Sequence, residues 1–502
     1  MIELATPHLL RQLGPVESVV VACGEAADRK WNRNFQRLLH PVPVKFLVEP
    51  AINYISEQRL VPRRITRAIS TALKKAMGNT RKDDCLVWAH NLGIGRNLIL
   101  SHEVIRACAA RNVPLVSHHH DWWFDNRWLR WPEMRRSGYH TLNAVARAVF
   151  PQVSILRHAA INRADSAMIE NGFPDREAWL PNPAAHDNRP PAAKIQGARR
   201  WLLHKLGGHE APVWILPCRL LRRKNVAEAL LLTRWLRPEA WLVITGGVSS
   251  ADELPYYQRL TEAAHHHHWR LRLGVLQGDE MRKPSVPELL AASEAVMLTS
   301  IQEGFGLPFL EAASAQRPLI ARQLPNIAPD LKQFGFHFPQ YYADILVDPR
   351  LFNWKNEYDR QTRMFHSWKS HLPQRCRGWA ETPALLAFQQ PQPVPFSRLT
   401  LTAQIEVLSE PARLSWALCA PLNPFLTRWQ RRALQGRLQT TPWPRQANRW
   451  LGGPAYAQRF HRIAYPDGPA RPQPDPATTQ ESFIREKLRA EHLFPLLWNR
   501  ES

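Results

Sequence analysis

The chain has 502 residues, of which 44% are hydrophobic and 22% are charged, a composition typical of a globular protein with two or three domains. No apolar run reaches the roughly 18 residues that span a bilayer. The N-terminus also lacks a basic segment followed by an apolar core, so we expect neither a membrane span nor a signal peptide. The cysteines show no C-x-x-C spacing, which argues against a zinc site or a disulfide framework and favours a reducing cytoplasm.

The charge balance is strongly basic, because 66 lysines and arginines face 43 acidic residues, for a net charge of +23. Such a charge attracts polyanions of any kind. The arginines are spread along the chain, however, and no nucleic-acid-binding module is apparent. We therefore expect a generally basic surface and no specific nucleic-acid partner, while weak contact with an anionic membrane surface stays open.

The first third of the chain alternates between predicted helices and strands. A helix is expected from about Ile2 to Leu13, a strand at 18–23, and another strand at 85–90. The turn at 91–97 leads into a helix that ends near Arg111. Gly93 and Gly95 lie in that turn, where they either cradle a ligand at the strand end or simply allow a strand-to-helix turn.

A strand predicted at 112–117 ends in His118, His119, His120 and Asp121. Successive side chains of an extended chain point to opposite faces, so only His118 and His120 could share a metal ion. The sequence offers no evident third donor, and we predict no metal site. The run His265–His268 falls between a predicted helix and a predicted strand, and we expect it to be a solvated helix end.

The middle of the chain has a clear strand–helix alternation. The expected strands are at 212–217, 240–245, 270–275 and 295–300, and the expected helices are at 225–236 and 286–293. Alternation of this kind predicts a parallel, doubly wound sheet. Arg219 and Lys224 follow the first of these strands, and Gly246 and Gly247 follow the second.

The stretch Glu303-Gly-Phe-Gly-Leu-Pro-Phe-Leu-Glu311 follows the last of these strands. Gly304 and Gly306 permit a tight turn, and Pro308 suits the first position of a helix. The amides of a helix start, together with the helix dipole, favour an anion such as phosphate. Glu303 and Glu311 would flank this anion site.

These two glutamates, separated by seven residues with the sequence GFGLP between them, resemble the signature of the retaining, nucleotide-sugar-dependent glycosyltransferases of family 4. Arg219 and Lys224 are similar to the R-x4-K element of that family. The resemblance covers about residues 80–350. It implies the GT-B fold, an α/β architecture of two Rossmann-like domains that face a cleft.

The resemblance also assigns site residues. On the donor side, it implies that Arg219, Lys224 and the loop of Gly304, Phe305, Gly306 and Leu307 bind the diphosphate, while Gly246 lets the nucleotide lie close to the backbone. Glu311 would bind the ribose hydroxyls and Glu303 the sugar hydroxyls. His120 and Asp121 would contact the donor sugar, and Trp122, Trp123 and Arg127, with Gly93 and Gly95, would contact the acceptor.

The predicted domains are an acceptor domain at 1–183, a donor domain at 184–350, a helical return segment at 351–388 and a C-terminal extension at 389–502. The first domain lacks the initial strand and glycine-rich loop that the family usually has. In the extension we expect one or two strands at 396–408, disorder at 465–479 and a short amphipathic helix at 481–498.

The sequence therefore predicts a cytoplasmic hexosyltransferase that needs neither metal nor cofactor. Its donor would be a UDP- or GDP-sugar, and its acceptor the hydroxyl of a small metabolite, a polysaccharide or a lipid-linked glycan. Two alternatives stay open. One is an inactive GT-B protein that binds or scaffolds, and the other is a polyanion-binding protein.

Overall fold

The computed structural model describes residues 2–80, 84–126, 128–184, 186, 189–278, 283–466 and 475–498. The chain divides into two compact units, each built from three separate segments. Unit 1 contains Met1–Ala185, His371–Trp379 and Gln446–Lys487. Unit 2 contains His186–Ser370, Ala380–Arg445 and Leu488–Ser502. The predicted division at 183 thus lies beside the first of several points at which the chain passes from one unit to the other.

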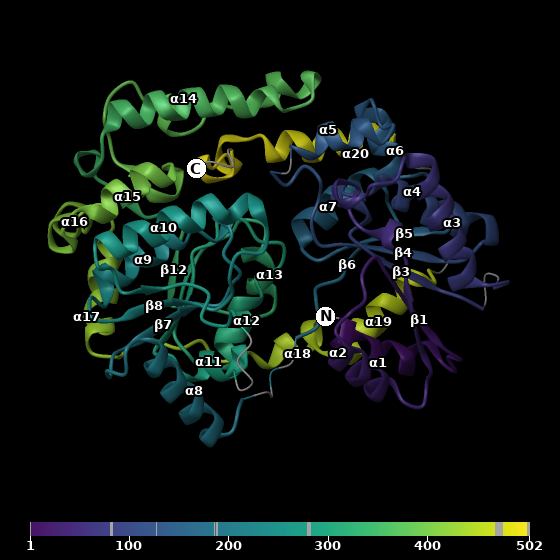
Figure 1. The fold of residues 1–502 in the computed structure, drawn as a ribbon, viewed down its shortest axis with the longest axis horizontal. Coiled ribbons are helices and arrows are strands. Elements are labelled where there is room, and N and C mark those ends of the chain that lie inside the picture. Colours follow the sequence, from purple (N-terminus) through teal and green to yellow (C-terminus); the bar gives the residue numbers. More distant parts are fainter. Residues whose placement is uncertain are drawn as a thin grey trace. The chain divides into compact units, whose positions relative to one another are not determined.

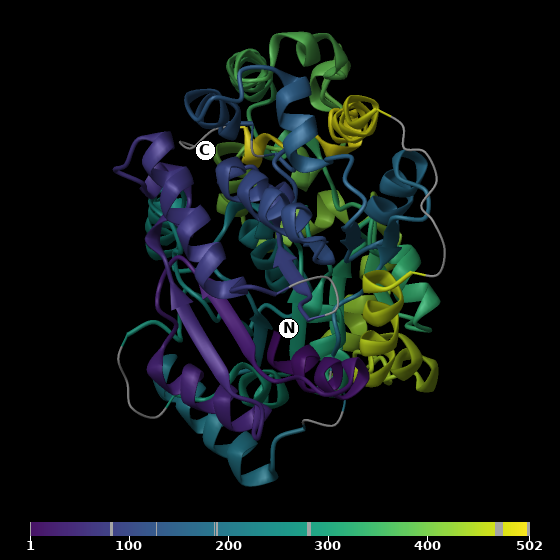
Figure 2. The ribbon, with the colours of Figure 1, turned by 90° about the vertical axis from the view of Figure 1, so that its right-hand side faces the viewer.

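Two parallel sheets form the centre of unit 1. The larger sheet has the order β3-β4-β5-β6, with β3 at Val87–His90, β4 at Leu115–His119, β5 at Leu156–Ala160 and β6 at Glu177–Trp179. The smaller sheet pairs β1 (Val19–Cys23) with β2 (Val44–Val48), and Figure 2 shows these two strands side by side. Because neighbouring strands run in the same direction, a crossover connection must join each pair.

Helices supply most of those crossovers in unit 1. They are α1 (Ile2–Leu13), α2 (Arg29–Leu39), α3 (Pro62–Met77), α4 (Leu98–Arg111), α5 (Arg130–Arg136), α6 (Leu142–Val149) and α7 (Arg163–Gly172). Local sequence sets several of the starts, since Asp28, Thr141 and Asn162 each accept a hydrogen bond from a first-turn amide. The helix predicted at Ile2–Leu13 is confirmed.

The end of the chain completes unit 1 with three more helices, α18 (Asn448–Leu451), α19 (Gly453–Ala464) and α20 (Pro476–Lys487). Tyr456 and Phe460 of α19 are buried in one apolar cluster with Ala5 and Leu9 of α1. Phe483 of α20 packs against the rings of Trp122, Phe124 and Phe150. These residues are therefore part of the unit 1 core, and the prediction of an appended C-terminal extension is corrected.

Unit 2 contains one six-stranded parallel sheet with the order β12-β11-β10-β7-β8-β9. Its strands are β7 (Val213–Leu216), β8 (Trp241–Ile244), β9 (Leu271–Arg272), β10 (Ala295–Leu298), β11 (Leu319–Arg322) and β12 (Gln340–Tyr342). All residues of β7 and β10 are buried, as expected for strands covered on both faces. The doubly wound α/β sheet predicted from the strand–helix alternation is confirmed. A separate antiparallel pair joins β13 (Leu346–Val347) to β14 (Val394–Pro395).

The helices of unit 2 surround this sheet. They are α8 (Ala192–Lys205), α9 (Val226–Leu236), α10 (Leu254–His266), α11 (Val286–Ala292), α12 (Leu307–Ser314), α13 (Ala328–Gln333), α14 (Trp354–Ser370), α15 (Leu401–Ser409), α16 (Ala412–Cys419) and α17 (Pro424–Leu434). Helix α9 is buried nearly all round because α15, α16 and α17 all pack against it (Figure 1). One such contact is the hydrogen bond from Trp235 Nε1 to Ser415 Oγ at 2.9 Å.

The strand prediction at 396–408 is wrong, since most of that segment is the helix α15. Thr400 starts this helix by accepting a hydrogen bond from the amide of Ala403. Leu401, Leu408 and the partly buried Ile405 then recur at helical spacing and pack in the unit 2 core.

The structure also differs from the predictions for the final segments. Helix α20 already begins at Pro476, inside the stretch predicted to be disordered, while residues 467–474 lie outside the described part of the chain. The helix expected at 481–498 ends at Lys487 and continues as short 3-10 turns. Phe494 and Leu496 in those turns are buried in the core of unit 2.

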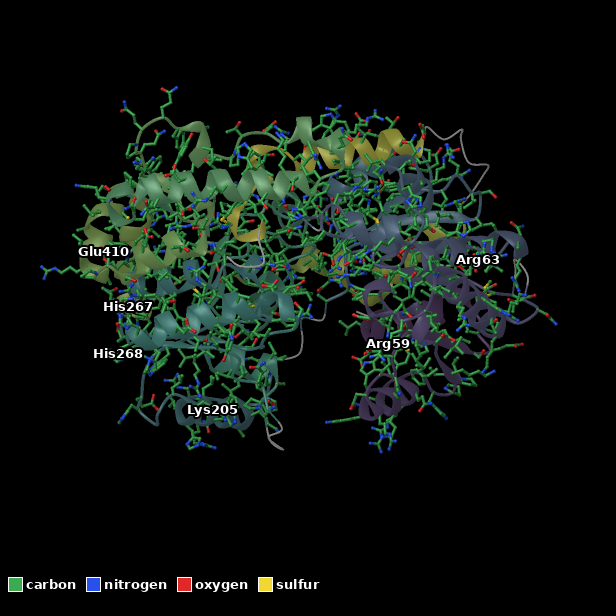
Figure 3. The ribbon with its side chains drawn as sticks, turned by 45° about the horizontal axis from the view of Figure 1, so that its top comes forward. Arg59, Arg63, Lys205, His267, His268 and Glu410 are labelled. Atoms are coloured by element: carbon green, nitrogen blue, oxygen red, sulfur yellow. The ribbon has the colours of Figure 1, made fainter. Side chains whose placement is uncertain are left out.

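The basic residues are spread over the surface, as expected. Figure 3 labels the exposed Arg59 and Arg63 in unit 1 and the half-buried Lys205 in unit 2. It also labels His267 and His268, and His267 forms a 3.0 Å hydrogen bond with Ser409 and stacks on Trp269, so the histidine run is only partly solvated. The six cysteines are free. Within the described ranges, no helix combines the length and the apolar character needed to cross a membrane.

Candidate donor and histidine sites

The strand order of unit 2 has a switch point between β7 and β10. From β7 the chain proceeds to β8 and β9 on one side of the sheet, and it then returns to β10, β11 and β12 on the other side. Open parallel sheets bind ligands at such a switch point, outside the carboxyl ends of the strands. The residues that follow β7 and β10 are therefore the ones that should meet a ligand.

Glu303, which follows β10, lies in a cluster of cations and hydrogen-bond donors. Its Oε1 accepts from Lys224 Nζ and, at 2.7 Å, from Ser300 Oγ. Its Oε2 accepts from Arg223 Nη1 at 3.0 Å, and Asn326 Nδ2 donates to its backbone carbonyl at 2.9 Å. The loops after β7 and β10 are thus tied together through one carboxylate.

Charge decides the protonation state of Glu303. Burial of the side chain alone would raise the pKa of this carboxyl group, but Lys224 and then Arg223 outweigh burial and hold the pKa at about 2. Glu303 is therefore ionised at neutral pH. Two further arginines of this basic loop are also paired, since Arg222 pairs with Glu253 and Arg223 pairs with Glu303.

Arg219 is the cation of this loop that faces solvent. Its side chain is exposed, and no ion pair joins it to any part of the chain that the structure describes. Gly246, after β8, shapes the backbone beside it. A Cβ at Gly246 would lie 2.9 Å from Cys218 O and 3.0 Å from Arg219 Cα, both of them backbone atoms. Glycine is needed here because the backbone carrying Arg219 passes so closely.

Glu311 lies in α12, the helix that follows the glycine turn. Gly306 precedes this helix with a φ of +76°, a conformation that favours glycine, and a Cβ there would also approach Phe309 to 2.8 Å. Burial raises the pKa of the Glu311 carboxyl group, and the positive charge of Lys224 opposes that rise. Phe305 is buried, whereas Leu307 is exposed at the start of the helix. Both glutamates of the signature thus lie in the field of Lys224.

In unit 1, His120 and Asp121 lie at the carboxyl end of β4. The Asn91 side chain holds this end, because its Oδ1 accepts from the backbone amides of His120 at 2.7 Å and Asp121 at 3.3 Å. His120 is half-buried, and burial lowers its pKa to about 4 despite the opposing charge of Asp121. Its imidazole is therefore neutral at neutral pH.

The predicted acceptor residues of unit 1 do not present a surface. Trp122 and Trp123 are fully buried, so neither ring can stack on a sugar, and the prediction of an aromatic acceptor wall is corrected. Gly93 and Gly95 make room for these rings, since a Cβ would approach Trp122 to 2.7 Å and Trp123 to 2.6 Å. These close contacts give the two glycines a packing role, which neither of the two alternatives for this turn had named. Arg127 lies outside the described residues.

Several residues of these sites were missed in the sequence. Arg223, Ser300 and Asn326 hold Glu303, and Asn91 holds the end of β4. His90 was also missed, although it ends the strand that pairs with β4, in register with His118. The shared carboxyl edge of two parallel strands was the available signal for His90.

Comparisons with known proteins agree with the donor-side geometry. The family "Glycosyl transferases group 1" matches residues 207–348, the segment that contains Arg219, Lys224, Gly246, Glu303 and Glu311. This segment is a glycosyl transferases group 1 domain. The predicted resemblance to glycosyltransferases is thereby confirmed over this segment, which contains the predicted donor-side residues.

Two curated relatives come from Petrotoga mobilis. Mannosylglucosyl-3-phosphoglycerate synthase is 26% identical over 306 residues, which cover 58% of this chain and 57% of the relative. Mannosylglucosylglycerate synthase is 21% identical over 279 residues, covering 50% and 62%. This chain therefore spans less than two thirds of either relative. Among solved structures, Anabaena HepE in complex with UDP and glucose is similar at 16% identity and a TM-score of 0.45, over 66% of this chain and 78% of HepE.

Proposed function

We propose that this protein transfers a hexose from a nucleoside diphosphate sugar, with uracil or guanine as the base, to a hydroxyl group of an acceptor. The observation that carries the proposal is the exposed, unpaired Arg219 at the β7–β10 switch point of a glycosyl transferases group 1 domain. A departing nucleoside diphosphate gains negative charge, and a guanidinium stabilises that charge by bidentate hydrogen bonds. The two relatives, which are named as synthases of mannosylglucosyl compounds, support a hexose as the transferred group.

The roles within the donor site follow from the contacts. Arg219 and the backbone amides of the turn at 304–307 bind the diphosphate. Glu311 binds the ribose hydroxyls. Glu303 fixes Lys224 and Arg223 through one hydrogen bond each and accepts a third from Ser300, which leaves acceptor capacity on its carboxylate for a sugar hydroxyl. No metal ion is required at this site, because protein cations provide the positive charge.

The remaining parts of the proposal concern the reaction itself. His120 and Asp121 contact a sugar at the carboxyl end of β4, and the acceptor attacks the face of the donor sugar that the diphosphate leaves. The transfer then proceeds with retention of configuration and without a protein nucleophile. The acceptor is a small hydroxylated metabolite, a polysaccharide or a lipid-linked glycan. The six free cysteines favour a reducing compartment, and we therefore propose the cytoplasm as the location.

Thermal shift with UDP, GDP and their sugars tests the donor site, since a ligand of the native state raises its stability. One of the two nucleotide series should raise the melting temperature, also in the presence of EDTA. Arg219→Gln should weaken the binding of that nucleotide about 10- to 100-fold, because a hydrogen bond to a charged group contributes a free energy of that size. Arg200→Gln is the matched control, because Arg200 is exposed on α8 of the same unit.

Activity separates the enzyme from an inactive scaffold. A transferase should release nucleoside diphosphate from the sugar that it binds, by transfer or by slow hydrolysis, and Arg219→Gln should lower that rate more than Arg200→Gln does. Nucleotide binding without any turnover over a panel of hydroxylated acceptors would favour the scaffold. No shift with either nucleotide series would contradict the donor site altogether.

A further inference from the structure

Three histidine rings gather at the carboxyl edge of the larger sheet in unit 1. His90 ends β3, His118 lies in β4 beside it in register, and His120 follows on the same face of the chain. One nitrogen from each ring can be chosen so that the three lie within 4.8 Å of one another. His119, which points to the other face, instead contacts His158 at 3.0 Å and stacks on Trp122.

His90 Nδ1 and His120 Nε2 share a hydrogen bond, whereas His118 keeps one ring nitrogen unused. His118 Nε2 donates to the carbonyl oxygen of Leu180 at 3.2 Å, which fixes the tautomer and leaves the lone pair on Nδ1. That Nδ1 is buried and has no hydrogen-bond partner among the described residues. A buried polar atom without a partner is uncommon in folded proteins and calls for an explanation.

The spacing suits a tetrahedral cation. Zinc–nitrogen bonds of roughly 2.0–2.1 Å place two tetrahedral ligands about 3.3 Å apart, and His90 Nδ1 and His120 Nε2 are 3.3 Å apart in the structure. The bond from His118 to Leu180 is of the kind that orients metal-bound histidines in proteins. His90 and His120 are half-buried, so a cation can enter from their side, and Trp88 and Tyr456 form an apolar wall behind the rings.

We propose that His90, His118 and His120 bind a divalent transition-metal cation of the zinc class through three imidazole nitrogens. The fourth coordination position is left for water or another small ligand. Neutral imidazole is a good ligand for zinc, copper and nickel and a poor one for magnesium and calcium. The cation takes a ring nitrogen of His120, so a bound metal ion and a direct contact from that nitrogen to a sugar exclude each other.

The test uses the metal alone and does not depend on the transferase proposal. The full chain is stripped with a chelator and then titrated with Zn²⁺ by calorimetry, and with Co²⁺ by visible absorption, which reports tetrahedral coordination. The wild type should bind one tight equivalent of Zn²⁺ and show the Co²⁺ band. Zn²⁺ should also raise its melting temperature, because the site exists only in the folded state.

Loss of one histidine ligand should weaken Zn²⁺ binding by more than the roughly 10- to 100-fold that the loss of a residue supporting a ligand causes. We expect this loss of Zn²⁺ affinity for His90→Asn and for His120→Asn, each of which replaces a half-buried ring. Circular dichroism without metal shows whether each variant is folded. The double variant His266→Asn and His268→Asn is the matched control, because it removes two exposed histidines that lie close together in sequence. Unchanged binding in His90→Asn, loss of binding in the control, or no stoichiometric Zn²⁺ in the wild type would each overturn the proposal.

Discussion

Glu303 is the residue on which the donor loop depends, because one carboxylate pairs with two cations from a different loop. Arg223 and Lys224 would repel each other and a nearby Arg219 without it. With Glu303 in place, two of the positive charges are fixed by the protein, and the exposed guanidinium of Arg219 is left for a ligand. The site is therefore preorganised for one anion. The positive charge that it offers to a ligand is smaller than the total charge of the three cations in the loop.

This arrangement makes the stability of unit 2 depend on pH through Glu303. Its pKa is 4.5 in the reference state and about 2 in the folded chain, so the stabilisation is complete above about pH 4.5 and is lost as the pH falls towards 2. A shift of that size corresponds to about 3 kcal/mol. Glu303→Gln should therefore unfold with less free energy than the wild type at pH 6, and the difference should shrink at pH 3.

Urea unfolding at the two pH values, followed by tryptophan fluorescence, gives the difference for Glu303→Gln. The control is Glu262→Gln, since Glu262 is exposed on α10 of the same unit and its variant should follow the wild type across the range. A difference between Glu303→Gln and the wild type that is the same at both pH values would show that the carboxylate is not held by charge.

At the scale of elements, α20 is attached to unit 1 by a buried ion cluster as well as by apolar rings. Lys487 Nζ lies 2.8 Å from Asp125 Oδ1 and 3.9 Å from Asp165 Oδ1. Asp125 also accepts from the amide of Trp122, and Asp165 accepts from the indole nitrogen of the same residue. The last residue of α20 thus places its ammonium group beside the two acids that position Trp122.

Lys487→Met should destabilise unit 1 by about 3–5 kcal/mol, because it leaves two buried carboxylates without their cation. Arg485→Met, on the same helix, removes an exposed charge that pairs with Glu481 and lies over the Trp379 ring, and it should cost about 1 kcal/mol. Thermal unfolding of the two variants provides the comparison. Similar melting temperatures for both would mean that the cluster contributes no more than a surface pair.

The elements that sequence could predict are those whose own residues determine them. The strand at β10 and the helix start at Pro308 carry local signals, in an apolar run and in glycine and proline positions, and both lie where they were expected. The α15 segment was misjudged because an apolar run of that length suits either a buried strand or a buried helix. The packing of α9 against α15, α16 and α17, which decides the matter, involves residues far apart in the chain.

The same limit applies to the sites. Arg219, Lys224 and Glu303 follow strands and could be predicted from strand order. The pairing of Arg223 with Glu303 could not, because it depends on side-chain directions at a loop. Trp122 and Trp123 were wrongly predicted to be exposed, because a run of aromatic residues does not show whether its side chains reach the surface. Phe483, more than three hundred residues away, is among the side chains that bury Trp122.

For the whole molecule, the main consequence is that neither unit is continuous in sequence. The segment that follows residue 445 supplies α19 and α20 to unit 1 and Phe494 and Leu496 to unit 2. A chain that ends at 445 would therefore expose the partners of Tyr456, Phe460 and Phe483. A truncated core phenylalanine costs roughly 3–5 kcal/mol, and losing several such residues exceeds the roughly 5–15 kcal/mol by which a protein is stable.

We accordingly expect a chain that ends at 445 to lose the cooperative unfolding of unit 1, bind a dye specific for exposed apolar surface and be cleaved rapidly by protease within residues 1–185. A chain that ends at Trp498 keeps every described element and should behave as the full chain does. If the shorter chain instead retained its near-ultraviolet circular dichroism and its protease resistance, α19 and α20 would be accessory to unit 1. The physical reason to expect otherwise is that Ala5 and Leu9 of α1 have their buried apolar contacts with α19.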